Sequence, residues 1–414
     1  MLDSVSLHDA KPELRAALVE IGFDTGTHET YQLLTSGKEL DALADPRHVR
    51  ELVHMIRGGV TVQAEEGMLE FRPLEGFAGL GTELTSARVI TAEQSNTSIV
   101  FDDELILKVF RRLEAGVNPE LELLRFLTER DFPNIAQLGG WYAYLGRPMD
   151  ATLGVLQQFV RNGVDGWELA LDELGDDPER FITRLHELGG VIGRMHTVLA
   201  SDLSDPAFAP EEPTDETLAL LTATVDEEIE RLFIDLPHVP EVAPIDGRGE
   251  EVRDRLRMLA GVGARGKLIR HHGDLHLGQT LLSGEGDDTE WIILDFEGEP
   301  ARSLLERRRK RSGLRDVAGM LRSFAYVASA SDIQRGRPAP EGWEDRAREA
   351  FLAGYLDTVD PSLLPPGGAN TRRLLSVYEL EKAVYELRYE LNNRPDWVRI
   401  PVAGIARLLE EPIA

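Results

Sequence analysis

The chain has 414 residues, 42% of them hydrophobic and 29% charged, which is the composition of an ordinary globular protein with more than one domain. It contains no cysteine, and this excludes disulfides, zinc–thiolate sites and cysteine nucleophiles. The formal net charge of −28 disfavours nucleic acid and anionic lipid as partners, so an anionic ligand needs local cations or Mg2+.

No hydrophobic stretch reaches the roughly 18–20 uncharged residues that a membrane helix needs. The first residues, MLDSVSLHDAKPELRAAL, lack the basic and then apolar segments of a signal peptide. We therefore expect a cytoplasmic protein that has no membrane partner.

Residues 1–90 mix a helical pattern with short strand-like runs. We predict a helix from Pro12 to Ile21 and strands in the segments THETYQLLTSG, GVTVQA and MLEFRPL. This mixture predicts a small α+β cap at the start of the chain.

Residues 91–165 predict a small lobe that is rich in β-strands. Two runs, Arg88–Ala92 and Ser98–Val100, flank a polar turn at 93–97, and a second turn leads into a strand at Leu105–Phe110. The segment NPELELLRFLTER predicts a helix that has Asn118 as its N-cap and proline at its first position. The segments IAQLGGWYAY and LGVLQQFVRNG follow as two more predicted strands.

Residues 166–414 have mainly helical patterns and predict a helical C-terminal lobe. Leu185, Leu188, Ile192, Met195 and Leu199 recur at helical spacing. Gly189 and Gly193 lie within this helix and would let a second helix pack closely against it. The last strong helical pattern covers residues 371–392.

The segment HHGDLHLGQTLL, residues 271–282, has two possible interpretations. His272 and His276 have the i, i+4 spacing of two metal ligands on a helix, but Gly273 between them argues against a helix there. The alternative is a phosphoryl-transfer loop, in which Asp274 accepts or orients the hydroxyl of the acceptor. Gln279 and Asp295, the latter in the strand-like run WIILDFEG, would then hold Mg2+ through oxygen ligands. We favour the phosphoryl-transfer interpretation.

The other polar residues of these segments carry weaker expectations. We expect His272 to brace the backbone of the loop and His271 to have no specific role. His276 is either structural or faces the substrate. Glu297 and Glu299 follow the second aspartate and would contact a second metal or water, or be solvated; for Glu299 we favour solvation.

A phosphoryl-transfer site requires a place for ATP, and residues 88–160 predict one. Lys108 lies in the apolar strand LILKVF, and we predict that it pairs with Glu122 of the next helix and contacts the ATP phosphates; Glu120 is a competing partner. The turn EQSNTS would offer hydroxyl, amide and backbone donors to phosphate from Ser95, Asn96, Thr97 and Ser98. The interlobe hinge would contact adenine through the backbone of Gln158, Phe159 and Val160.

The helix at 371–392 carries a polar stripe opposite its apolar face. Leu380, Val384, Leu387 and Leu391 form the apolar face, while Lys382, Tyr385, Glu386, Tyr389 and Asn393 cluster on the other side. A cation, an acid and two aromatic rings suit the recognition of a sugar, although an exposed face with Lys382–Glu386 pairing is the alternative. Trp397 follows the helix and would close the site or pack the tail.

The basic run ERRRKR, residues 306–311, is unusual in so acidic a chain. A solvated loop that counters nearby acidic groups is the favoured interpretation. A contact with phosphate or with a protein partner is the alternative.

Several of these segments together resemble the maltokinases, which belong to the aminoglycoside-phosphotransferase-like branch of the protein-kinase-like fold. The resemblance rests on EQSNTS, ILKVFRR followed by NPELE, HGDLHLGQ, LDFEGEP, LRDVAGMLRSF and LEKAVYE with RPDW, and it covers residues 88–412. It implies an α+β, bilobal kinase-like fold with an N-terminal cap. It also implies a kinase that uses ATP and Mg2+ to convert maltose to maltose 1-phosphate.

By the same resemblance, Lys108 matches the ATP lysine, Asp274 the catalytic aspartate, and Gln279 and Asp295 the Mg2+ ligands. Lys382, Tyr385, Glu386 and Tyr389 match the sugar-facing helix, and this set favours maltose as the acceptor. A rival interpretation makes a trehalose-isomerising enzyme the partner and this chain its non-catalytic scaffold, but the intact set of Lys108, Asp274, Gln279 and Asp295 argues against it.

Two related kinase groups remain as alternatives. The family's cap usually opens with a tryptophan-containing RQRWF-like segment, which this chain lacks; only THETYQLL resembles the cap. The glucosamine kinases share most of the phosphotransfer motifs and would produce glucosamine 6-phosphate, which makes them the second choice. An aminoglycoside-type phosphotransferase is the third.

Overall fold

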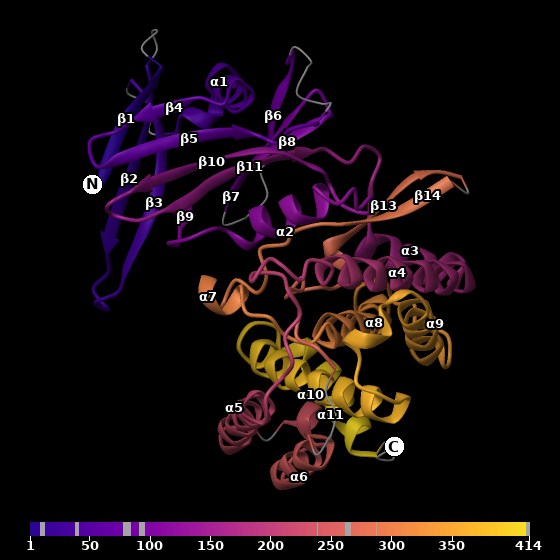
Figure 1. The fold of residues 1–414 in the computed structure, drawn as a ribbon. Helices are drawn as coiled ribbons and strands as arrows, with labels where there is room; N and C mark the ends of the chain where they lie inside the picture. Colours follow the sequence, from indigo (N-terminus) through magenta and orange to yellow (C-terminus); the bar gives the residue numbers. More distant parts are fainter. Residues whose placement is uncertain are drawn as a thin grey trace. The chain divides into compact units, whose positions relative to one another are not determined.

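The computed structural model describes residues 1–8, 13–37, 41–77, 84–90, 96–237, 239–260, 266–286 and 288–410. The chain forms two compact units, which are described separately (Figure 1). The first unit comprises Met1–Gly163 and Ser283–Arg307, and the second comprises Val164–Leu282 and Arg308–Ala414.

The first unit begins with an antiparallel sheet in the order β1-β2-β3-β9. Its strands are β1 (Asp3–His8), β2 (Leu14–Gly22), β3 (His28–Ser36) and β9 (Arg112–Leu113). The helix predicted from Pro12 to Ile21 is therefore wrong, because this segment forms β2; Pro12 itself lies outside the described residues. Pairing with β1 on one side and β3 on the other outweighs the helix propensity of its alanines, leucines and glutamate.

A seven-stranded antiparallel sheet forms the larger part of the first unit, in the order β4-β5-β10-β11-β8-β7-β6. Its strands are β4 (Thr61–Gln63), β5 (Gly67–Pro73), β6 (Ala87–Ile90), β7 (Asn96–Phe101), β8 (Leu105–Phe110), β10 (Leu138–Gly146) and β11 (Ala151–Gln158). Every one of these strands overlaps a predicted strand. The helix α1 (Pro46–Gly58), which follows the short 3-10 helix η1 (Ala42–Ala44), was not predicted; it packs against β5 and β10.

Buried polar side chains fasten the two sheets of the first unit to each other. Tyr142 donates to Gln32 Oε1 at 3.0 Å, and Gln32 Nε2 donates to the carbonyls of Phe110 and Leu153. Buried hydrogen bonds of this kind define one arrangement of the two sheets, since each broken bond would leave an unpaired polar group in the core.

The remaining elements of the first unit are the helix α2 (Pro119–Thr128), the strand β14 (Asp288–Ile293) and the short helix α7 (Leu304–Arg307). The predicted N-cap of α2 is confirmed, because the Asn118 side chain accepts from the Glu120 N–H at 2.8 Å. The boundary between the units falls within the strand β13 (Thr280–Glu285). Leu281 and Leu282 of this strand belong to the second unit and pair with β12 (Val164–Asp165).

The second unit is helical, as predicted. Its helices are α3 (Gly166–Asp176), α4 (Pro178–Leu199), α5 (Asp215–Ile234), α6 (Gly249–Ala260), α8 (Leu314–Arg335), α9 (Trp343–Thr358), α10 (Gly368–Asn393) and α11 (Arg399–Glu410). Four short 3-10 helices join them: η3 (Pro240–Val242), η4 (Leu277–Gln279), η5 (Pro361–Leu363) and η6 (Pro395–Trp397).

Helices α5, α6, α10 and α11 pack around one hydrophobic cluster, and Figure 1 shows them grouped together. In the part of the chain that is described, no helix combines the length and the apolar character needed to cross a membrane.

Two glycines of α4 let a second helix pack closely against it, as predicted. A Cβ at Gly189 would overlap the Phe351 carbonyl of α9, and a Cβ at Gly193 would overlap Thr358 Oγ1. The helices α4 and α9 can approach this closely only because both positions lack a side chain. The five predicted apolar residues of α4 are buried in the core.

Candidate functional site

In the first unit, β8 and α2 bring a lysine and a glutamate together. Lys108 forms an ion pair with Glu120, and the side chains of the two residues are 13% and 0% exposed. The predicted partner, Glu122, is therefore wrong, and the competing candidate is correct. The N-cap starts α2 so that Glu120 shares the buried face of the helix with the leucines three and four residues later, whereas Glu122 lies at its edge.

Asp295 and Glu297 complete a carboxylate cluster around this lysine. One carboxylate oxygen from each of Glu120, Asp295 and Glu297 lies within 4.8 Å of the others. Burial favours the neutral amine of Lys108, but attraction to these three carboxylates outweighs burial and raises its pKa. Burial, followed by repulsion from Glu120 and Asp295, raises the pKa of Glu297 to about 8.

This crowding of carboxylates suits a divalent cation. Hard cations such as Mg2+ prefer carboxylate oxygens, and a cation would relieve the repulsion that raises the pKa of Glu297. Asp295 has a left-handed backbone with φ of 60°, a conformation that non-glycine residues seldom adopt and that is often found at functional sites. The predicted Mg2+ ligand Asp295 thus belongs to a site that fits the ion.

The predicted phosphate loop lies partly beside this cluster. Ser95 lies outside the described residues, and Asn96, Thr97 and Ser98 belong to β7, so the predicted turn ends earlier than residue 97. Asn96 Nδ2 donates to Glu297 Oε1 at 2.8 Å, and the buried Ser98 pairs directly with Lys108 across the sheet. The Thr97 hydroxyl accepts from Arg111 Nε at 2.8 Å, so it is already engaged.

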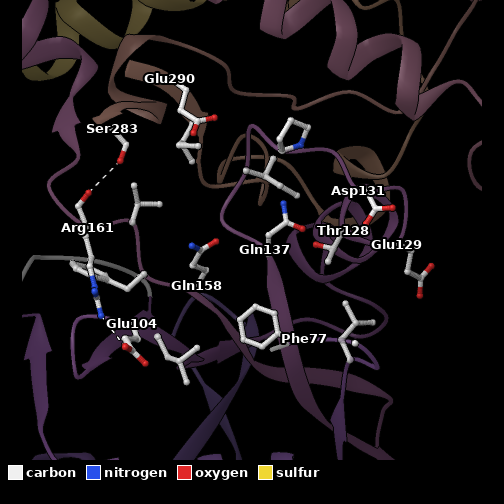
Figure 2. Close-up of a pocket in the computed structure, with 18 of the residues that line it drawn as sticks. Phe77, Glu104, Thr128, Glu129, Asp131, Gln137, Gln158, Arg161, Ser283 and Glu290 are labelled. Carbon is white, nitrogen blue, oxygen red and sulfur yellow. Dashed lines mark hydrogen bonds and ion pairs between the residues drawn. The ribbon is translucent and has the colours of Figure 1, made fainter. Parts of the chain in front are cut away.

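The predicted hinge follows β11. Phe159 N–H donates to the Glu104 carbonyl at 2.8 Å, and Gln158 N–H donates to the Gln137 carbonyl at 2.9 Å. Gln158, Phe159 and Val160 line a cavity of about 980 Å³ (Figure 2). The lining carries one arginine, Arg161, and is acidic because it has five carboxylates, which belong to Glu75, Glu104, Glu129, Asp131 and Glu290. Lys108 and the carboxylate cluster do not line this cavity.

The basic run at 306–311 is largely structural. Arg307, whose side chain is 7% exposed, pairs with Glu114 and donates to the Glu297 carbonyl at 3.1 Å, which holds the loop after Asp295 in place. Lys310, in the second unit, donates to the carbonyls of Pro206 and Ala209. The expected countering of nearby acidic groups is confirmed for these two residues, which pair with Glu114 and Glu211, but their expected solvation is wrong because both side chains are buried.

Glu299 is not solvated either. It is 6% exposed and pairs with Arg302 at 2.7 Å. The favoured expectation for Glu299 is therefore wrong, because a basic residue three positions later allows its burial.

In the second unit, Asp274 is half-buried beside the helix α10. Its Oδ1 lies 3.2 Å from Lys382 Nζ, so this lysine of the predicted sugar-facing stripe reaches the predicted phosphoryl-transfer loop. Burial acts to raise the pKa of Asp274, but the nearby charges of Lys382 and His276 outweigh burial and hold its pKa below the usual range. Asp274 is therefore ionised at neutral pH, as an acceptor of a proton must be.

A buried aspartate fixes the backbone of this loop. Asp316 of α8 accepts from the N–H groups of His272 at 2.7 Å and Gly273 at 2.9 Å. It also contacts His196 Nε2 at 3.0 Å, and His196 Nδ1 lies 3.1 Å from the Tyr355 hydroxyl. Burial opposes ionisation of Asp316, but the histidines around it lower its pKa. Asp316 lies in LRDVAGMLRSF, one of the segments that resemble the maltokinases. The sequence alone did not indicate the role of Asp316 or of His196.

The histidines of the loop do not form a metal cage. His272 Nδ1 accepts from the Asp274 N–H at 3.4 Å, which confirms its bracing role. His276 caps η4 by accepting from the Gly278 N–H at 3.1 Å. This contact agrees with a structural role, one of the two alternatives expected for His276. Among the described residues, the potential metal-binding group that the geometry reveals consists of carboxylates only. Gln279, the other predicted Mg2+ ligand, is the last residue of η4 and is half-buried.

The structure divides the predicted sugar-facing stripe of α10 into two groups. Lys382 Nζ lies 5.4 Å from the centre of the Tyr385 ring, so these two residues share the neighbourhood of Asp274. Glu386 belongs to another group: it is 8% exposed and accepts from Arg322 Nε of α8 at 2.9 Å. The expectation that Glu386 lies on an open polar face is therefore wrong.

Tyr389 and Trp397 lie near this second group. Tyr389 is 45% exposed, and the Arg394 guanidinium lies 5.4 Å from the centre of its ring. Trp397 stacks on Tyr326 with 6.1 Å between ring centroids, and the Tyr326 hydroxyl donates to Glu390 at 3.0 Å. Both residues thus have packing partners of their own, Arg394 after the end of α10 for Tyr389 and Tyr326 of α8 for Trp397.

Comparison with known proteins finds relatives in sequence and a solved structure of similar fold. No family model matches the chain. A glucosamine kinase of Mycolicibacterium smegmatis is 27% identical over 348 residues, which cover 78% of this chain and 80% of the relative. A glucosamine kinase of Streptacidiphilus jiangxiensis is 26% identical over 363 residues, which cover 82% of this chain and 76% of the relative.

A solved structure of a glucosamine kinase in complex with glucosamine, ADP and inorganic phosphate superposes with a TM-score of 0.77 at 20% identity. The superposition covers 98% of this chain and 93% of that chain. This chain has the glucosamine kinase fold. The predicted α+β, kinase-like fold is confirmed, and the relatives carry the name of the second choice rather than of the maltokinases.

Proposed function

We propose that the chain is an ATP-dependent carbohydrate kinase that transfers the γ-phosphate to the 6-hydroxyl of glucosamine. The observation that carries the proposal is an ionised, rigidly held aspartate, Asp274, in a chain related over about four-fifths of its length to two glucosamine kinases. The first unit binds the phosphate donor, and the second unit activates the acceptor.

On the donor side, the ammonium of Lys108 binds the ATP phosphates. Glu120 orients this ammonium, and the surrounding carboxylates keep it charged despite its burial. Asp295, assisted by Glu297, would hold Mg2+, which supplies positive charge to the transferred phosphate. Gln279, in the second unit, stays a predicted ligand. Asn96 donates to Glu297 and so ties the start of β7 to this group.

On the acceptor side, Asp274 accepts the proton of the sugar hydroxyl as the hydroxyl oxygen forms a bond to the γ-phosphorus of ATP. The bond from this phosphorus to the bridging oxygen breaks, and ADP leaves. The pKa of Asp274 is held below its usual range, so the carboxylate is ready to accept at neutral pH. Asp316 binds the two backbone N–H groups that precede Asp274, and this rigid support limits the reorganisation that the reaction requires.

The choice between the two sugars turns on α10. Maltose was favoured because four residues of this helix formed one polar stripe. Glu386 pairs with Arg322 inside the helical unit instead, which removes the acid from that stripe. The reason to prefer maltose is thereby weakened, and the names of both relatives favour glucosamine.

The test is a coupled assay of ADP release from Mg-ATP with glucosamine, maltose, glucose, trehalose and kanamycin as acceptors. We expect turnover with glucosamine, and a product phosphorylated at the 6-position by NMR. Turnover with maltose alone would restore the maltokinase interpretation. An absence of turnover with all five acceptors would refute the proposal.

The Asp274→Asn variant examines the assigned base. We expect turnover to fall by about 10²–10⁴-fold, the usual contribution of a positioned general base, while ADP binding by calorimetry stays within twofold. Asp332→Asn, which alters an exposed carboxylate of α8 paired with Arg399, is the matched control and should retain full activity. Equal activity of the two variants would remove Asp274 from the mechanism.

A further inference from the structure

The last buried residue before the hinge carries a polar atom without a partner. Gln157 of β11 is 5% exposed, and its Oε1 has no hydrogen-bond partner among the described residues. A buried amide oxygen that lacks a donor costs about 1–3 kcal/mol, so such groups are rare and call for an explanation.

The strand register shows which face of the sheet Gln157 occupies. Gln157 pairs with Ile106 of β8, and Val155 pairs with Lys108. Directly paired residues share a face, and so do residues two apart in one strand, so Gln157 and Lys108 lie on the same face. Gln158, one residue later, points to the opposite face and lines the acidic cavity of Figure 2, which Gln157 does not line.

This position lies between the two ends of the proposed nucleotide site. Strand geometry places the Cα atoms of Gln157 and Lys108 about 8 Å apart, one strand across and two residues along. The hinge backbone begins at the next residue. A nucleotide that reaches from Lys108 to the hinge therefore passes its base beside Gln157.

We infer that the Gln157 side chain binds the edge of the purine base, with Oε1 accepting a hydrogen bond from the 6-amino group of adenine. The inference rests on the proposed function, because it requires that ATP be the donor. A glutamine amide oxygen matches adenine, since it accepts from the amino group at the edge of the base. The bound base supplies the donor that Oε1 lacks.

The test measures binding of ADP and of purine riboside 5′-diphosphate, which lacks the 6-amino group, by calorimetry on the full chain. In Gln157→Met, which keeps the length of the side chain but loses the amide, we expect ADP to bind about tenfold more weakly. Binding of the analogue should change by less than twofold, because it has no amino group to lose.

Two further variants make the test specific. Gln157→Glu retains an acceptor at the same position and should retain the preference for ADP over the analogue. Gln63→Met, the same substitution on the edge strand β4, should change neither affinity; Gln63 is exposed and bonds only to neighbouring carbonyls.

Each outcome separates this inference from the proposed function. Equal weakening of ADP and the analogue in Gln157→Met would make Gln157 a merely structural residue and overturn the inference. Unchanged ADP binding would mean that Oε1 meets only water, with the same result. Failure of the unaltered protein to bind ADP would refute the kinase proposal itself.

Discussion

At the scale of single residues, the proposed nucleotide site of the first unit depends on charges that stabilise one another. Lys108 is almost buried, and an isolated ammonium in that place would lose its proton. The three carboxylates around it reverse this tendency, and their own repulsion is relieved by the lysine. Removal of one partner therefore leaves a buried charge without compensation.

The glutamates of α2 offer a matched pair of substitutions for this idea. We expect Glu120→Gln to lower kcat/KM for ATP by at least tenfold, since Lys108 loses the partner that orients it. Glu122→Gln removes the same charge from the same helix without breaking this pair, and should stay within twofold. Steady-state kinetics with ATP varied provide the measurement, and similar losses in both variants would contradict the assignment of Glu120.

At the scale of elements, the local sequence pattern predicted correctly those features of helices and strands that residues of the same segment determine. The N-cap of α2 was correct because it depends on residues that are neighbours in the chain. The close packing of α4 was correct because Gly189 and Gly193 lie four residues apart on one face of the helix, although the sequence does not name the partner helix. The strand β2 was mistaken for a helix because LRAALVEI suits either structure alone. Its pairing with β1 and β3 decides the outcome, and no local pattern contains that information.

Two neighbouring glycines of α4 allow the helix contact to be tested. A Cβ at Gly189 would overlap the backbone of α9, so we expect Gly189→Ala to destabilise the protein by about 1–3 kcal/mol or more. A Cβ at Gly190 would meet its first atom, the flexible end of Arg194, at 3.4 Å. Gly190→Ala should therefore be neutral or stabilise by about 0.5–1 kcal/mol through helix propensity. The free energy of unfolding in urea, measured for both variants, tests this expectation. Equal values for the two variants would argue against the tight α4–α9 contact.

At the scale of the whole molecule, the sequence predicts which residues take part in the chemistry. It does not predict which distant side chains hold those residues in place. Asp274, Lys108 and Asp295 were predicted to act in the site because phosphoryl transfer requires those residue types in those motifs, and their roles stay predictions. Glu386 was misplaced because its partner, Arg322, lies on another helix and no spacing rule connects them. The role of Asp316 was missed for the same reason, since it acts on a loop distant in sequence.

The stability of the protein should also depend on pH through a residue without an assigned role. His271 is buried, and neither ring nitrogen has a hydrogen-bond partner among the described residues. Burial lowers its pKa from the usual 6.5 to about 3, so the folded protein keeps this imidazole neutral at mildly acidic pH. The unfolded chain binds a proton below about pH 6.5, so stability falls as the pH decreases from 6.5 towards 3.

This linkage contributes about 2 kcal/mol of lost stability between pH 7.5 and pH 5. We expect His271→Leu and His271→Gln to remove that contribution, so each variant should gain about 2 kcal/mol relative to the unaltered protein over this interval. The free energy of unfolding in urea, measured at both pH values, provides the comparison. A change in packing shifts a variant equally at both pH values, whereas proton uptake changes the slope. Parallel pH profiles for all three proteins would show that His271 is protonated in the folded state as readily as in the unfolded one.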